Sequence, residues 1–151
     1  MAKTNIERFD VISADILAHL YQAFPVPISV TPKVSGLTER KVTSYDPVSE
    51  IVVTSGARDP ETEFFQETLA WLAMSGFILR RNHHGIQAEY VLTSHGLQTL
   101  NHVPKPSLGN ETLGDKLSTA AKNGAVGAAK EVMSQVISIG VQLLAKTSGL
   151  P

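Results

Sequence analysis

The sequence DPETEFFQETLAWLAMSGFILRR, residues 59–81, decides the fold of this chain. Asp59 is a typical N-cap residue, and Pro60 suits the first position of a helix. Apolar side chains then recur at helical spacing, and Gly76 is expected to end the helix in the left-handed conformation. The stretch therefore predicts a helix over residues 59–75 that leads directly into an extended segment.

A hairpin is predicted next, over residues 77–92. Two strand-like runs are joined by the polar segment at residues 82–85, which ends in glycine. Thr93 or Ser94 can cap the helix that follows, and we expect this helix to reach about Val103. The order of elements is thus helix, hairpin and shorter helix.

The chain before this stretch begins with a predicted helix over residues 5–24. Pro25 and Pro27 end it, because proline disfavours a helical residue before it and supplies no amide donor. Its apolar face is predicted to consist of Phe9, Ile12, Ile16, Leu20 and Ala23.

The segment between the two long helices gives mixed signals. Residues 28–30 form a short β-prone run, and residues 32–37 favour a single helical turn. An extended run is predicted over residues 50–54, followed by a loop at Ser55 and Gly56.

The central stretch resembles the winged helix-turn-helix superfamily. The resemblance is carried by LAMSGFI at residues 72–78 and YVLTSHGLQTL at residues 90–100. In that superfamily a recognition helix ends in a glycine-aromatic or glycine-aliphatic step, a wing follows, and a leucine-threonine-x-x-glycine segment opens the closing helix. The resemblance covers residues 59–103 and, more loosely, 5–24. It implies a winged-helix-like domain over residues 1–104 but no single function, since such domains serve as DNA readers, protein adaptors and dimerisation modules.

The rest of the chain has a different composition. Residues 105–112 are predicted to form a linker, and residues 113–147 a C-terminal amphipathic helix. Small and then large apolar residues recur along this helix at spacings of three and four: Leu117, Ala121, Gly124, Ala128, Val132, Val136, Ile139 and Leu143. We therefore expect an α+β fold that is mainly α, in which a winged-helix-like domain with a β-hairpin wing is followed by a long C-terminal amphipathic helix.

Charge and composition narrow the function classes. The 151 residues include thirteen basic and fourteen acidic side chains, so the protein as a whole is no polycation. This balance counts against a partner held mainly through phosphate contacts. The sequence contains no cysteine, which excludes disulfides and thiolate metal sites. The first residues show no apolar core of a secretory signal, so we expect a cytoplasmic protein.

A site for DNA can be sought in two places. The helix over residues 59–75 takes the place of a recognition helix, yet it carries Glu63 and Glu67 and no Lys or Arg, so the duplex would repel it. The wing is the better candidate for nucleic-acid contact, through Arg80, Arg81, His83 and His84.

Catalysis and metal binding find no support in the sequence. His83 and His84 are adjacent, so they would point to opposite faces of a strand, and the other histidines lack acids or cysteines at ligand spacing. The sequence contains neither a glycine-rich phosphate loop nor a nucleophile elbow. We therefore expect a protein that is not an enzyme and that uses no cofactor and no metal.

The favoured hypothesis is a non-enzymatic module for macromolecular interaction. Its predicted partner-binding residues are Glu63, Glu67, Ala70 and Met74 on the central helix and Val132, Val136, Ile139 and Leu143 on the C-terminal helix. The C-terminal helix would serve self-association, giving a homo-oligomer, or docking on a protein partner or on the head of the chain. Two alternatives remain: a DNA-binding regulator that uses its wing, and a membrane-associating protein that uses the C-terminal helix.

Overall fold

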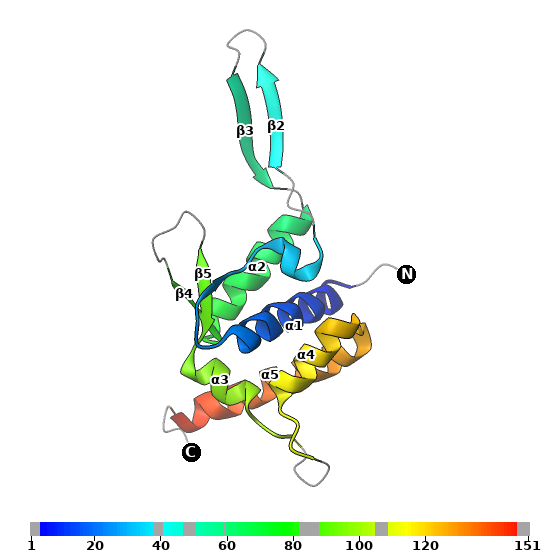
Figure 1. The fold of residues 1–151 in the computed structure, drawn as a ribbon, viewed down its shortest axis with the longest axis vertical. Helices are drawn as coiled ribbons and strands as arrows, with labels where there is room; N and C mark the ends of the chain where they lie inside the picture. Colours follow the sequence, from blue (N-terminus) through cyan, green and yellow to red (C-terminus); the bar gives the residue numbers. More distant parts are fainter. Residues whose placement is uncertain are drawn as a thin grey trace.

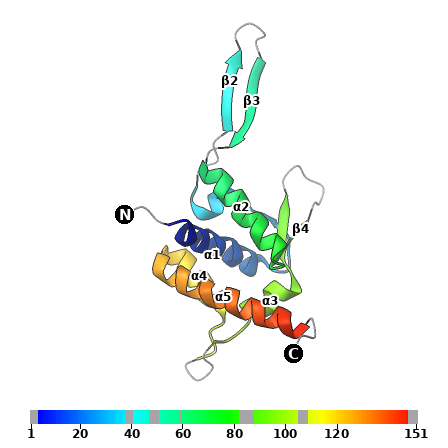
Figure 2. The same ribbon diagram turned by 180° about the vertical axis from the view of Figure 1, so that it is seen from behind.

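The structure is a computed structural model that describes residues 4–37, 41–46, 51–58, 60–81, 88–104 and 109–147. Within these residues it is mainly helical, with one small antiparallel sheet and a separate hairpin (Figures 1 and 2). The elements in chain order are α1 (Asn5–Ala23), β1 (Ile28–Ser29), η1 (Pro32–Ser35), β2 (Lys41–Asp46), β3 (Ile51–Arg58), α2 (Pro60–Met74), β4 (Ile78–Arg81), β5 (Glu89–Leu92), α3 (Ser94–Leu100), α4 (Leu113–Asn123) and α5 (Val126–Thr147). The expected α+β, mainly α fold is confirmed.

Helix α1 lies at the centre of the molecule, with α2 on one side and α4 and α5 on the other (Figure 1). It begins after Thr4, whose hydroxyl caps the helix by accepting a hydrogen bond from the Glu7 amide at 3.2 Å. Ile16 and Leu17 are both fully buried, although they are neighbours and lie on different sides of the helix. Helix α1 is therefore covered on two faces, whereas the sequence predicts only one apolar face.

The three-stranded sheet has the order β1-β5-β4, with all neighbours antiparallel. Strand β1 lies in the β-prone run at residues 28–30, and it pairs Ile28 with Tyr90 of β5. Strands β4 and β5 form the predicted hairpin, whose tip at residues 82–87 lies outside the described residues. Helix α2 followed by this hairpin and α3 is an arrangement compatible with a winged helix.

The segment between η1 and α2 differs from the prediction. Strands β2 and β3 form a two-stranded antiparallel hairpin, and in both views it extends away from the helices (Figures 1 and 2). The predicted loop at Ser55 and Gly56 is wrong, because both residues belong to β3. The single extended run predicted at residues 50–54 is one strand of a pair, and its partner β2 begins at Lys41. Cross-strand pairing, which no local signal reveals, explains the difference.

The C-terminal region contains two helices, where the sequence predicts one helix over residues 113–147. Gly124 ends α4 in the left-handed conformation, with φ +63°, and its amide donates to carbonyl groups of the last turn. Gly124, which the sequence pattern places on the apolar stripe, is therefore the C-cap of α4. The expected long C-terminal helix is confirmed as α5, although it begins only at Val126.

Helix α3 depends on the absence of a side chain at Gly96. A Cβ atom built at this position would lie 2.1 Å from the carbonyl oxygen of Phe77, at the start of β4. Thr93 caps the same helix, because its hydroxyl accepts a hydrogen bond from the Gly96 amide at 2.9 Å. Helix α3 thus approaches the backbone at the start of the hairpin too closely for any larger residue. It ends at Leu100, three residues before the predicted limit at Val103.

We predict that Gly96→Ala lowers the free energy of unfolding by about 1–3 kcal/mol, since the new methyl group must displace backbone atoms. The matched control is Gly127→Ala in α5, where a Cβ meets nothing within 4 Å. This control should instead raise the free energy of unfolding by about 0.5–1 kcal/mol, because alanine favours the helix. Urea unfolding followed by circular dichroism measures both. Equal effects of the two substitutions would contradict the close contact.

Candidate interaction site

An open apolar groove lies between the N-terminal half of α1 and the outer face of α2. Its volume is about 530 Å³. The lining residues are Asn5, Ile6 and Phe9 from α1, and Phe64, Glu67, Thr68, Ala70, Trp71 and Met74 from α2. The groove therefore lies between the first helix of the chain and the helix that precedes the β4–β5 hairpin.

The apolar side chains of this groove are unusually exposed. Met74 is 83% exposed, Ile6 67% and Trp71 38%. Scattered apolar residues on a surface are normal, but these three line one groove. Contiguous apolar surface on a protein often marks a place where another molecule binds.

A row of aromatic rings forms the wall behind the groove. The Phe9 and Trp71 rings meet edge to face with their centroids 5.0 Å apart, and the Trp71 and Phe77 rings stack at 6.5 Å. Phe77 in turn lies 5.3 Å from the His95 ring. Since Phe77 is buried, the row ties the exposed groove to the core and holds Trp71 in place.

The predicted α2 residues lie where the sequence places them. Glu63, Glu67, Ala70 and Met74 are all exposed, and the last three line the groove. Sequence reasoning missed the contribution of α1, because it assigned Phe9 to the core face and overlooked Ile6. An apolar residue off the predicted face of α1, near its first turn, was the available signal.

The predicted residues of the C-terminal helix have a different environment. Val132 and Val136 of α5 are buried in the core of the chain itself, and Ile139 packs against that core. Leu143 is partly buried. This stripe therefore docks on the helices that precede it, and it does not present an open surface to another molecule.

One buried charge lies where α5 meets α1. Asp10 is only 7% exposed, and burial raises the pKa of its carboxyl group, with Lys130 opposing this shift and Glu7 adding to it. The Lys130 ammonium also lies 3.9 Å from the Glu7 carboxylate. Lys130 is thus a cation that partly compensates Asp10 and Glu7 where α5 meets α1.

The wing residues do not form one cationic face. Arg80 and Arg81 are both exposed on β4, but side chains of adjacent strand residues point to opposite faces. Arg81 is paired across the strands with Glu89, an acid. His83 and His84 lie outside the described residues, so the structure gives them no position.

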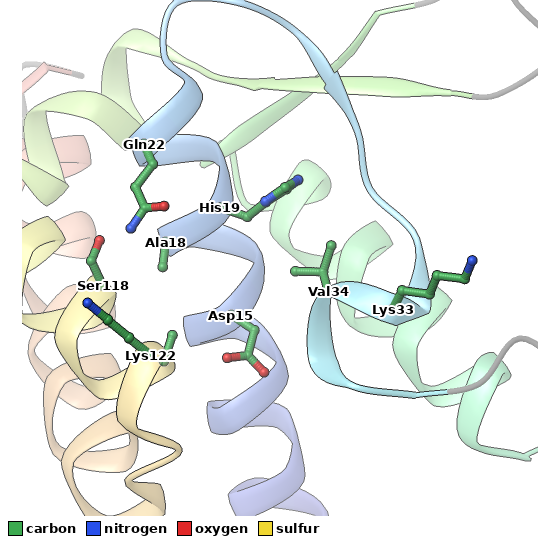
Figure 3. Close-up of a pocket in the computed structure, with 9 residues that line it drawn as sticks. Asp15, Ala18, His19, Gln22, Lys33, Val34, Ser118 and Lys122 are labelled. Carbon is green, nitrogen blue, oxygen red and sulfur yellow. The ribbon is translucent and has the colours of Figure 1, made fainter.

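A second hollow of about 680 Å³ lies between α1, η1 and α4 (Figure 3). It contains two lysines, but their ammonium groups point to opposite sides: that of Lys122 lies over α4 near Ser118, and that of Lys33 points away from α1 (Figure 3). Asp15 lies between them and brings a negative charge. The charged groups therefore do not converge on one point where a small anion could be held.

The described parts of the chain contain no group of three or more His, Asp or Glu residues that could hold a metal ion. None of the helices in these parts is long and apolar enough to cross a membrane.

We predict that Val136→Ala lowers the free energy of unfolding by about 1–3 kcal/mol, because Val136 has no exposed surface and its truncation leaves a cavity. The exposed α5 residue Ser134 provides the control, and Ser134→Ala should change stability by less than about 0.5 kcal/mol. Urea unfolding should be repeated at several protein concentrations. A midpoint that rises with concentration would show that α5 is buried between copies and would contradict docking within one chain.

A pH dependence is predicted for His95, whose Nε2 atom is buried and makes no hydrogen bond among the described residues. Burial lowers the pKa of the His95 imidazole below its usual value of 6.5. The unfolded chain therefore binds this proton more readily, and stability should fall as the pH drops from about 6.5 toward the pKa in the folded protein.

His95→Phe keeps a planar ring against Phe77 and should remove this part of the pH dependence. The unchanged protein, measured over the same pH range, provides the reference slope. Thermal unfolding measured from pH 7.5 to 5 in about half-unit steps gives the slopes. An unchanged slope in His95→Phe would contradict the assignment.

Comparison with known proteins adds no relative: no protein-family model, no curated protein and no solved structure matches this chain.

Proposed function

We propose that this protein is a non-enzymatic module with a winged-helix-like fold, which binds a partner protein in the groove between α1 and α2. The observation that carries the proposal is the gathering of Ile6, Trp71 and Met74, all well exposed, along one groove. Burying such side chains against a partner is favourable by about 25 cal/mol per Å² of apolar surface.

The winged-helix interpretation is supported by the order of elements. Strand β1 pairs with β5, and β4 and β5 form a hairpin between α2 and α3, which gives α2 the place of the recognition helix. The chain departs from the usual pattern before α2, where η1 and the hairpin β2–β3 occupy the place of a second helix. The superfamily resemblance in the sequence and the strand order thus support the same interpretation.

Electrostatics favour a protein partner over DNA. Helix α2 carries Glu61, Glu63 and Glu67 and no basic residue, so its exposed face would be repelled by phosphate groups. Two well-exposed arginines, Arg80 and Arg81, favour the second candidate, which is DNA contact through the wing. Because their side chains belong to opposite faces of β4, they offer weaker support for binding than the continuous groove does.

The C-terminal helix contributes in a different way in this proposal. Its apolar stripe is used inside the chain, where Val132 and Val136 are buried. We therefore assign α5 to stabilising the head, and we place partner docking on α1 and α2. Self-association or membrane contact through this stripe would require α5 to leave its own core.

A photo-crosslinking amino acid at position 70 tests the proposal. Ala70 is exposed and lines the groove, so this variant should form a covalent adduct with a protein in an extract of cells that make the chain. The control carries the same amino acid at position 134, on the exposed face of α5, and should give no such adduct. The adduct should persist after nuclease treatment and disappear when Met74→Glu is added.

The DNA candidate is tested in parallel by fluorescence anisotropy with a nonspecific duplex at low salt. We expect no binding by the intact protein. Binding that falls steeply with salt and is lost in Arg80→Ala/Arg81→Ala, together with no adduct at position 70, would overturn the proposal in favour of the wing.

A further inference from the structure

We propose that the occupant of the α1–α2 groove is a basic amphipathic helix of the partner protein. This inference rests on the proposed function, and it specifies which chemistry the groove selects. The charge of the groove and its shape both support this occupant, and a second copy of this chain fits the groove poorly.

The rim of the groove on the α2 side is acidic. Glu67 lines the groove, and Glu63 lies one turn earlier on the same exposed stripe. Helix α2 contains no Lys or Arg that could neutralise these carboxylates. On the α1 side, Arg8 lies with its guanidinium 4.2 Å from the centre of the Phe64 ring, so it is held over an aromatic face and not beside these carboxylates. Positive charge on a partner would therefore complement the α2 side of the rim.

The shape of the groove suits a helix. Helix α2 has 15 residues and thus spans about 22 Å, and Ala70 and Met74 are one turn apart along it. A groove between two helices accepts the side-chain ridge of a third, with apolar residues of the bound helix repeating every three or four positions. Small-molecule sites instead bury most of the ligand, which a groove lined by Ile6 and Met74 at 67% and 83% exposure does not do.

A second copy of the chain is a poor occupant. Two identical copies most often meet through the same patch on both, so the Glu63 and Glu67 stripe of one copy would approach that of the other. Such like charges oppose association. A partner helix with lysine or arginine flanking an apolar stripe meets the same patch with the opposite charge and with matching apolar surface.

The test uses synthetic peptides of about 18 residues, which span some 27 Å when helical. One peptide carries leucine at helical spacing with lysine on the other face, and its matched counterpart carries glutamate in place of every lysine. Neither contains tryptophan, so Trp71, the single tryptophan of the chain, reports binding through its emission. Trp71 lines the groove and is 38% exposed, and a bound helix should shift its emission to shorter wavelength.

We expect the lysine peptide to shift the Trp71 emission and to bind at least about tenfold more tightly than the glutamate peptide, a difference of about 1.4 kcal/mol. The variant Glu63→Lys/Glu67→Lys should lose at least tenfold in affinity, and the milder Glu63→Gln/Glu67→Gln should lose less. The control Glu131→Lys reverses one such charge on the exposed face of α5 and should retain the affinity. All variants are checked for unchanged unfolding by circular dichroism.

The remaining outcomes separate this inference from the function on which it rests. Equal binding of both peptides with a Trp71 response overturns the charge selection but leaves docking in the groove intact. An equal loss of affinity in Glu131→Lys and in the α2 variants shows general charge attraction and overturns the inference. Failure of every peptide, alongside an adduct at position 70, overturns the basic helix alone. A dimer in sedimentation that Met74→Glu abolishes would establish the second copy as occupant.

Discussion

The burial of α1 on two faces is the constraint on which the rest of the structure depends. Ile16 and Leu17 have no exposed surface, and neither do Ala14 and Ser13, so only the stripe of Val11, Asp15 and His19 is partly exposed in the middle of this helix. Helix α2 and the small sheet cover one face of α1, and α4 and α5 cover the other. Since a single helix layer cannot cover both faces, the C-terminal helices are required to complete the core.

The location of the proposed interaction surface follows from this arrangement. Most large apolar residues of α5 pack on α1 and the neighbouring core, although Val141 and Leu144 are exposed. Gly140 lets α5 approach the Phe77 ring, because a Cβ there would lie 2.7 Å from that ring. The N-terminal end of α1 nevertheless leaves Ile6 beside α2 without cover. The groove is therefore one apolar surface that the completed core leaves exposed, and Leu79, Val141 and Leu144 are exposed elsewhere.

Local signals in the sequence predicted most element boundaries but not their packing. Thr93 caps α3 and Gly76 follows α2 with φ +85°, both as expected, because caps depend on a few neighbouring residues. The pairing of β2 with β3, and the docking of Val132 and Val136 on their own chain, depend on contacts between distant residues. A stripe at helical spacing shows that a surface will be buried, but it does not show against which partner. For the same reason, the sequence pattern does not show that α1 contributes residues to the groove.

The three glutamates of α2 do not all have the same physical explanation. Glu61 and Glu63 lie in the first turn, where carboxylates favour the positive end of the helix dipole, so their presence needs no partner. Glu67 lies beyond that turn, and the dipole effect has faded there. Glu67 lines the groove, and α2 contains no basic residue that could pair with it. Ala70 and Met74, three and seven positions later, continue the same exposed stripe. Helix stability explains neither this carboxylate nor the exposed methionine, whereas a bound helix with apolar and cationic side chains would contact both.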